Sequence, residues 1–153
     1  IERLGGCITE RDLFMLGLGL YWGEGTKSWR QAGIANSDPN LIKFALEWFQ
    51  LVWGIDNSRL SFHVLINEIH RERVPVVENF WAKIVNVPVE KFRKTTLIKA
   101  KNKKVYMNFS NHYGTLKVSV KRPIEIHHEI IGMIKGLNGQ PAGVAQSAVA
   151  TES

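Results

Sequence analysis

A short apolar segment that ends on an acid offers the clearest chemistry in this chain. Residues 16–25 read Leu-Gly-Leu-Gly-Leu-Tyr-Trp-Gly-Glu-Gly and predict a helix that ends near Gly23. Gly19 and Gly23 stand four residues apart, so they share one helix face and leave it flat enough for a second helix to approach. Glu24 would lie at the helix C-terminus, where the macrodipole disfavours a negative charge by several tenths of a kcal/mol. We therefore interpret Glu24 as a functional carboxylate.

A purely structural interpretation fits the same residues. In it, the segment is a buried helix that ends on Gly25 in the left-handed conformation, and Glu24 is simply solvated. Glycine inside a helix costs about 1 kcal/mol relative to alanine, so stability alone is a weak reason for placing several glycines there.

Basic residues are concentrated in one part of the chain. Residues 91–122 contain ten Lys or Arg and no Asp or Glu, although the whole chain has 20 basic and 14 acidic residues and a net charge of +6. The remaining residues therefore carry a net charge of −4. This segregation favours a surface that binds a polyanion. A solvated lysine-rich loop explains Lys101–Lys104 equally well, but it explains the basic residues on the expected strands less well.

Capping signals and helical periodicity predict four helices. Thr9 and Asp12 form a capping box at the start of the first helix, and Asp38 followed by Pro39 starts the second. Apolar residues at helical spacing identify the third, and Pro123 opens the last. The predicted helices cover residues 9–23, 38–52, 74–85 and 123–136.

Strand regions are expected between these helices. Residues 59–66 alternate between apolar and polar types, which predicts a half-buried strand with Arg59, Ser61 and His63 on its polar face. Residues 27–36 predict a short strand or hairpin. Residues 92–101 and 115–121 predict a basic β-hairpin with a long loop.

The segment that ends at Gly25 resembles the LAGLIDADG motif of homing endonucleases, which are DNA nucleases associated with introns and inteins. It has the family's two small residues (Gly19 and Gly23), its leucine (Leu20), its acid (Glu24) and its final glycine. The chain is also similar to small bacterial proteins related to these endonucleases, through Tyr-Trp-Gly-Glu-Gly-Thr-Lys, Asn-Ser-Asp-Pro and Phe-Trp-Ala-Lys. The order of elements approximates the family's αββαββα plan with an added helix, so the resemblance covers roughly residues 12–137.

The resemblance implies an α+β fold in which a mixed antiparallel sheet forms a saddle and helices pack on one of its faces. We expect residues 1–137 to form a single LAGLIDADG-like domain. Residues 138–153, which are rich in Gly, Ala, Ser and Val and lack periodicity, are expected to be a disordered tail. Because the chain has one copy of the motif, it would act as a homodimer, with Gly19 and Gly23 at the helix–helix interface.

The resemblance also implies roles for individual residues. Glu24 takes the position of the acid that binds a divalent metal, Mg²⁺ or Mn²⁺, although glutamate is one methylene longer than aspartate. Lys121, at the end of the last strand, and Asn36, before the second helix, are further catalytic candidates; Lys121 could equally be an ordinary phosphate contact. The residues expected to contact DNA are Lys27, Arg30, Gln31, Arg59, His63, Arg93, Thr95, Lys99 and Lys117.

Two functions follow as alternatives. The first is a divalent-metal-dependent DNA endonuclease, a phosphodiester hydrolase, that acts as a homodimer on a roughly palindromic double-stranded site. The second is a catalytically inactive DNA-binding regulator on the same scaffold, which the glutamate at the acid position favours. An RNA-binding maturase is a third and weaker alternative. Enzyme status stays open, with the nuclease preferred.

Other classes find little support in the sequence. The five histidines show no zinc-site spacing, and neither a phosphate-binding loop nor a nucleophile motif occurs. The longest nearly apolar run, Leu13–Gly23, is too short to span a bilayer, so no membrane partner is expected. The single cysteine, Cys7, suits a reducing compartment. We expect a cytoplasmic protein that is associated with the nucleoid when it is bound to DNA.

Overall fold

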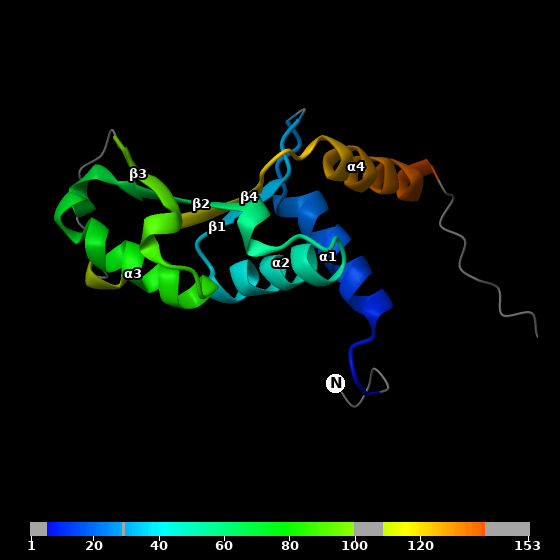
Figure 1. Cartoon of the computed structure of the whole chain (residues 1–153), viewed down its shortest axis with the longest axis horizontal. Coiled ribbons are helices and arrows are strands. Elements are labelled where there is room, and N and C mark those ends of the chain that lie inside the picture. Colours follow the sequence, from blue (N-terminus) through cyan, green and yellow to red (C-terminus); the bar gives the residue numbers. More distant parts are fainter. Residues whose placement is uncertain (1–5, 29, 100–108, 140–153) are drawn as a thin grey trace, which may run out of the picture.

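A four-stranded mixed sheet organises the part of the chain that the computed structural model describes, residues 6–28, 30–99 and 109–139 (Figure 1). Helices accompany this sheet, so the expected α+β class is confirmed. The strands are β1 (Gly33–Asn36), β2 (Leu60–Asn67), β3 (Phe92–Ile98) and β4 (Thr115–Val120). The longer helices are α1 (Glu10–Glu24), α2 (Pro39–Leu51), α3 (Val74–Val85) and α4 (Ile124–Gly139).

The strands lie in the order β1-β4-β2-β3, in which β4 is antiparallel to both of its neighbours and β2 is parallel to β3. The predicted hairpin between residues 92–101 and 115–121 is therefore wrong, because β2 lies between β3 and β4. The chain from β2 to β3 passes through α3, and parallel pairing needs such a long crossover. β2 and β4 take the two inner positions, and alternate residues are buried in each of them.

The pairing between β2 and β3 changes register halfway along. His63 is opposite Arg93, but two residues further along β2 the partner is Thr96, so β3 uses one residue more than β2. This β-bulge reverses the alternation of β3. Thr95 consequently faces α3, where its hydroxyl donates a 2.5 Å hydrogen bond to Glu78. The prediction that Thr95 lies among the outward residues is therefore wrong.

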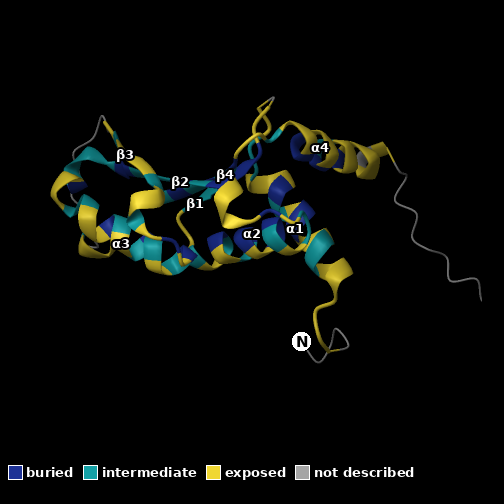
Figure 2. Ribbon diagram, viewed as in Figure 1, coloured by how far each residue is buried: buried dark blue, intermediate teal, exposed yellow. Residues whose placement is uncertain are grey.

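Helices α2 and α3 cover one face of the sheet, and the core lies between these helices and the strands (Figures 1 and 2). Trp48 of α2 and Trp81 of α3 are the largest of its fully buried side chains. α1 packs beside α2 at Gly17, where an added Cβ would lie 2.0 Å from Cδ1 of Trp48. α4 lies at one end of the molecule, next to α1 (Figure 1).

The start of α1 agrees with the prediction from the sequence, whereas the residue that follows its end has a different backbone conformation from the one expected. The capping box is present, since Asp12 N–H donates to the Thr9 hydroxyl at 3.2 Å and Thr9 N–H donates to the Asp12 carboxylate at 2.9 Å. Gly25, which follows the helix, is extended (φ −73°) rather than left-handed as expected. Glycine is required here by a close approach instead, because an added Cβ would lie 2.4 Å from the Tyr21 carbonyl oxygen.

The last helix, α4, extends into the segment that was expected to be a disordered tail. α4 reaches Gly139, three residues past the predicted end at Gly136, so the first two residues of the expected tail are helical. Residues 140–153 lie outside the described residues, as do Lys101–Lys104. Among the described helices, none is long and apolar enough to cross a membrane.

Candidate nucleic-acid interface

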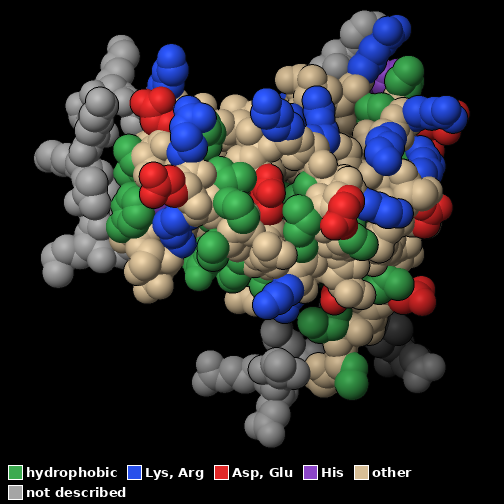
Figure 3. All heavy atoms as spheres, turned by 60° about the vertical axis from the view of Figure 1, so that its left-hand side comes forward, with side chains coloured by type: hydrophobic (Ala, Val, Ile, Leu, Met, Phe, Trp, Pro, Cys, Tyr) green, Lys and Arg blue, Asp and Glu red, His purple; other side chains and the backbone are tan. Residues whose placement is uncertain are grey.

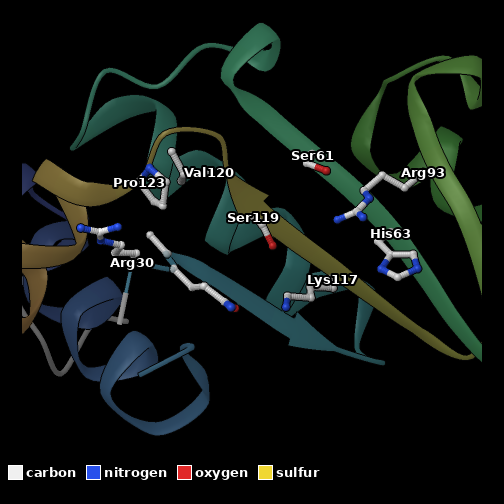
Figure 4. A pocket seen from close by; sticks show the side chains of 10 residues that line it. Arg30, Ser61, His63, Arg93, Lys117, Ser119, Val120 and Pro123 are labelled. Atoms are coloured by element: carbon white, nitrogen blue, oxygen red, sulfur yellow. The ribbon is translucent and has the colours of Figure 1, made fainter. Parts of the chain in front are cut away.

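The sheet face opposite α2 and α3, which we call the open face, carries polar and basic side chains. β2 and β4 bury every second residue against the helices, so the intervening residues point to the open face. The strand register places Arg93 of β3, His63 of β2 and Lys117 of β4 opposite one another, and we call these three the basic row (Figure 4). In Figure 3 most of the visible Lys and Arg side chains stand in the upper half of the molecule, on the side of the open face in Figure 1.

A second row, of small residues, lies next to the basic row. Ser61 of β2 is opposite Ser119 of β4, and Ser119 is opposite Gly33 of β1. No side chain fits at position 33, because an added Cβ would lie 2.6 Å from the Val118 carbonyl oxygen. A hollow of about 290 Å³ lies over Ser61 and Ser119 (Figure 4). Its described lining contains no acid and consists of Arg30, Gln31, Ala32, Ser61, His63, Arg93, Lys117, Ser119, Val120 and Pro123.

The basic row brings cationic groups together, and no acid is found among the described residues that line the hollow. Burial, followed by the charges of Arg93 and Lys117, lowers the pKa of His63 below its ordinary value of 6.5. Nε2 of His63 lies 2.9 Å from the Thr96 hydroxyl, which fixes the ring. Within the described part of the chain, neither Arg93 nor Lys117 forms a salt bridge. Arg93 and Lys117 lie on the two strands that flank His63, so an anion over this row would be attracted by both charges.

Five of the nine predicted DNA-binding residues line the hollow, and the other four do not. Lys27 lines a separate crevice between the end of α1 and α4. Arg59 precedes β2 and donates from Nη2 to the main-chain carbonyl of Arg122 at 3.5 Å. Lys99 is exposed just past the end of β3, whereas Thr95 faces α3.

Glu24 and Asn36, two of the catalytic candidates, lie together. The side-chain amide of Asn36 donates to the Glu24 carboxylate at 3.5 Å. The amide oxygen of Asn36 accepts from the Asp38 N–H at 2.9 Å, which turns the amide nitrogen toward Glu24. The structure therefore joins the end of α1 to the end of β1 through two side chains that were selected from the sequence.

Lys121, the third catalytic candidate, lies elsewhere. Its ammonium donates to the Ser58 carbonyl at 2.8 Å. Asn36 is opposite Leu116 at the start of β4, and Lys121 is five residues further along the chain. Five residues of extended strand span about 17 Å. Within one chain, Lys121 therefore lies away from Glu24 and Asn36, because antiparallel pairing puts the end of β1 at the start of β4.

Ligands for a divalent cation are sparse within one chain. Among the described residues, no group of three or more His, Cys, Asp or Glu side chains could hold a metal ion. The carboxylate of Glu24 is the type of oxygen ligand that Mg²⁺ and Mn²⁺ prefer, but one carboxylate makes a weak site. The donor set therefore fits a cation only where a second chain and phosphate oxygens complete it.

The outer face of α1 is open. Gly19 and Gly23 are exposed, and an added Cβ at either position meets nothing within 4 Å. Met15, Leu16 and Trp22 share this face at helical spacing and are 44%, 57% and 44% exposed. Small residues flanked by large apolar ones form a strip against which a second helix can pack.

Some residues of the open face were not selected from the sequence. Ser61 and Ser119 were not among the predicted DNA-binding residues, although the alternation of β2 and β4 places both outward. Thr96 was missed because the bulge that turns it outward has no signal in the sequence.

No family model matches the chain, and comparison with characterised proteins and with solved structures also gives no match.

Proposed function

We propose that this protein binds double-stranded DNA through the open face of its sheet. The basic row supports this most directly, because three neighbouring strands each supply a cationic or titratable group and the described lining of the hollow beside them has no acid. A polyanion over the row would be attracted by Arg93 and Lys117 together. Neutralisation of phosphates by Lys and Arg supplies much of the affinity of proteins for DNA.

The side chains on the open face suit a duplex better than a single strand. Arg93 and Gln31 can form bidentate hydrogen bonds with base edges in the major groove, while Lys117 neutralises phosphate. Alternate residues of a strand point the same way, so a sheet can present several such groups at once. Proteins that bind single strands rely on aromatic stacking, and the described lining of the hollow contains no Phe, Tyr or Trp.

Selection from a random double-stranded DNA library tests this proposal, with binding of the selected duplex then measured over a range of salt concentrations. We expect affinity to fall steeply with salt, and Lys117→Gln to reduce the slope of log K against log salt by about one. Lys83→Gln on α3, on the covered side of the sheet, is the matched control and should leave the slope unchanged. Equal effects of the two substitutions would contradict the placement of DNA on the open face.

A second function, metal-dependent DNA cleavage by a homodimer, is favoured by the contact between Glu24 and Asn36. Pairing of two chains through the outer face of α1 would bring two Glu24 carboxylates together, each held by its own Asn36. A divalent cation bound there would supply a Lewis acid for phosphodiester hydrolysis. A DNA-binding regulator uses the same open face without cleavage.

Nicking of the selected duplex in Mg²⁺ or Mn²⁺ separates the nuclease from the regulator. Equilibrium sedimentation of the same preparation tests the homodimer. A protein that binds DNA as a monomer and nicks it in neither ion is not the proposed nuclease.

A further inference from the structure

We propose that the hollow on the open face is a discrete site for one phosphate group. This inference rests on the proposed function, because it assigns that group to the DNA backbone. The contrasting possibility is a diffuse positive potential that attracts DNA without a fixed contact. The donors that line the hollow, and the lack of an anion among its described lining residues, favour a discrete site.

Hydrogen-bond donors from three strands line the hollow. In Figure 4, Arg93 reaches from β3 over β2 to the space between Ser61 and His63. A guanidinium is a planar fork whose N–H groups match two oxygens of one phosphate. Lys117 of β4 adds a point charge, and the Ser119 hydroxyl on the same strand adds a neutral donor. An oxyanion such as phosphate has several oxygens that can accept from more than one of these donors.

The hollow has room for a phosphate group. Its volume of about 290 Å³ is about ten times the share of one water molecule in the liquid, which is about 30 Å³. A phosphate can therefore lie against the strands.

The described part of the chain offers no anion of its own to fill the site. The lining has no Asp or Glu, and Arg93 and Lys117 form no salt bridge with a described residue. An anion held beside His63 would favour the protonated ring, so occupancy should raise the pKa of His63. This change gives a readout that belongs to the hollow alone.

The experiment titrates inorganic phosphate into the protein at constant ionic strength, with sodium chloride as the balancing salt, and follows the His63 ring by NMR. We expect saturable shifts, a raised His63 pKa, and an affinity for phosphate about tenfold lower in Lys117→Gln. Lys83→Gln makes the same charge change on α3 and should retain wild-type affinity. Arg93→Gln replaces Lys117→Gln as the test if the latter does not fold.

Competition between phosphate and the selected duplex separates the two levels of the proposal. We expect phosphate to displace DNA at the concentration that saturates His63, in wild type but not in Lys117→Gln. Tight DNA binding without saturable phosphate binding overturns the discrete site and leaves the proposed function standing. Saturable phosphate binding without DNA binding keeps the site, assigns it to a free phosphorylated ligand, and overturns the proposed function. Shifts that chloride reproduces at equal ionic strength also overturn the site.

Discussion

Nη1 of Arg73 lies 3.2 Å from Nδ1 of His70, a side chain that is only 3% exposed. A guanidinium has no acceptor, so a proton on Nδ1 of His70 would point at Arg73 without a partner, and this contact therefore favours an unprotonated Nδ1. The same guanidinium donates to the main-chain carbonyls of Phe109, Ser110 and His112. Neutral His70 thus helps Arg73 to hold the turn at residues 109–112 against the segment that precedes α3.

Acid should weaken this turn. Burial, followed by the charges of His112 and Arg73, lowers the pKa of His70 below its ordinary value of 6.5. The unfolded chain binds the proton more readily, so the contribution of His70 to stability is complete above about pH 6.5 and is lost as the pH falls toward the folded-state pKa. Hydrogen-exchange protection of the amides at residues 109–113, corrected for the intrinsic rate, should fall over this interval.

Replacement of His70 tests the cause of that pH dependence. His70→Asn keeps an acceptor near the position of Nδ1 and does not titrate, so protection at residues 109–113 should become nearly independent of pH. His128→Asn removes an exposed histidine on α4 and should leave the wild-type profile. A profile that persists unchanged in His70→Asn would show that another group controls the turn.

The bulge in β3 provides a second prediction, because Thr95 and Thr96 are neighbours with opposite environments. Thr95→Val removes the hydrogen bond to Glu78 and should lower the free energy of unfolding by about 1–2 kcal/mol with little effect on DNA affinity. Thr96→Val removes the contact with His63 and should lower DNA affinity by about fivefold with little effect on stability. Chemical denaturation and DNA titration of both variants check this, and reversed effects would contradict the register.

Replacement of Gly17 and of Gly19 in α1 by alanine is expected to change the stability of the protein in opposite directions. Gly17→Ala drives a Cβ into the Trp48 ring and should destabilise the protein by about 2 kcal/mol or more. Gly19→Ala meets nothing within 4 Å and should stabilise a single chain by about 1 kcal/mol through helix propensity. Thermal unfolding of the two variants under conditions where the chain is monomeric provides the comparison.

Gly19 also tests the proposed homodimer. A leucine there fills the strip between Met15 and Trp22, so Gly19→Leu should produce monomers in equilibrium sedimentation. Gly136→Leu places the same side chain on an uncrowded position of α4 and should not. Dimers that survive Gly19→Leu would place the interface elsewhere.

Glu24→Gln separates binding from cleavage. The substitution keeps the shape of the side chain but removes the charge that attracts a hard cation. DNA binding should persist, while cleavage in Mg²⁺ should fall by at least about a thousandfold. Cleavage that survives in Glu24→Gln would place the active site away from the end of α1.

The parts of the fold that depend on local chemistry could be predicted from the sequence. The capping box at Thr9 and the start of α2 at Asp38 follow from side chains that satisfy free N–H groups within a few residues. The buried and open faces of β2 and β4 follow from strict alternation. This alternation predicts from the sequence alone that His63 and Lys117 face outward, without knowledge of the strand order.

Features that depend on distant parts of the chain could not be predicted in the same way. The insertion of β2 between β3 and β4 depends on tertiary pairing. Because β3 and β4 follow one another in the sequence, the sequence favoured a hairpin between them. The position of Lys121 follows from the antiparallel pairing of β1 and β4, which residue spacing does not reveal. Gly17 and Gly19 look equivalent in the sequence, yet only Gly17 is in contact with another helix.

The junction between α1 and β1 has a mechanical consequence. The hydroxyl of buried Tyr21 donates to the Thr26 carbonyl at 2.8 Å, Thr26 N–H donates to the Gly33 carbonyl at 2.8 Å, and Gly25 bridges to Ile34. These contacts tie the end of the helix to the edge of the sheet. In a pair of chains that meet along α1, this connection would fix the distance between the two open faces. The two halves of a DNA target would then have to be separated by one particular number of base pairs.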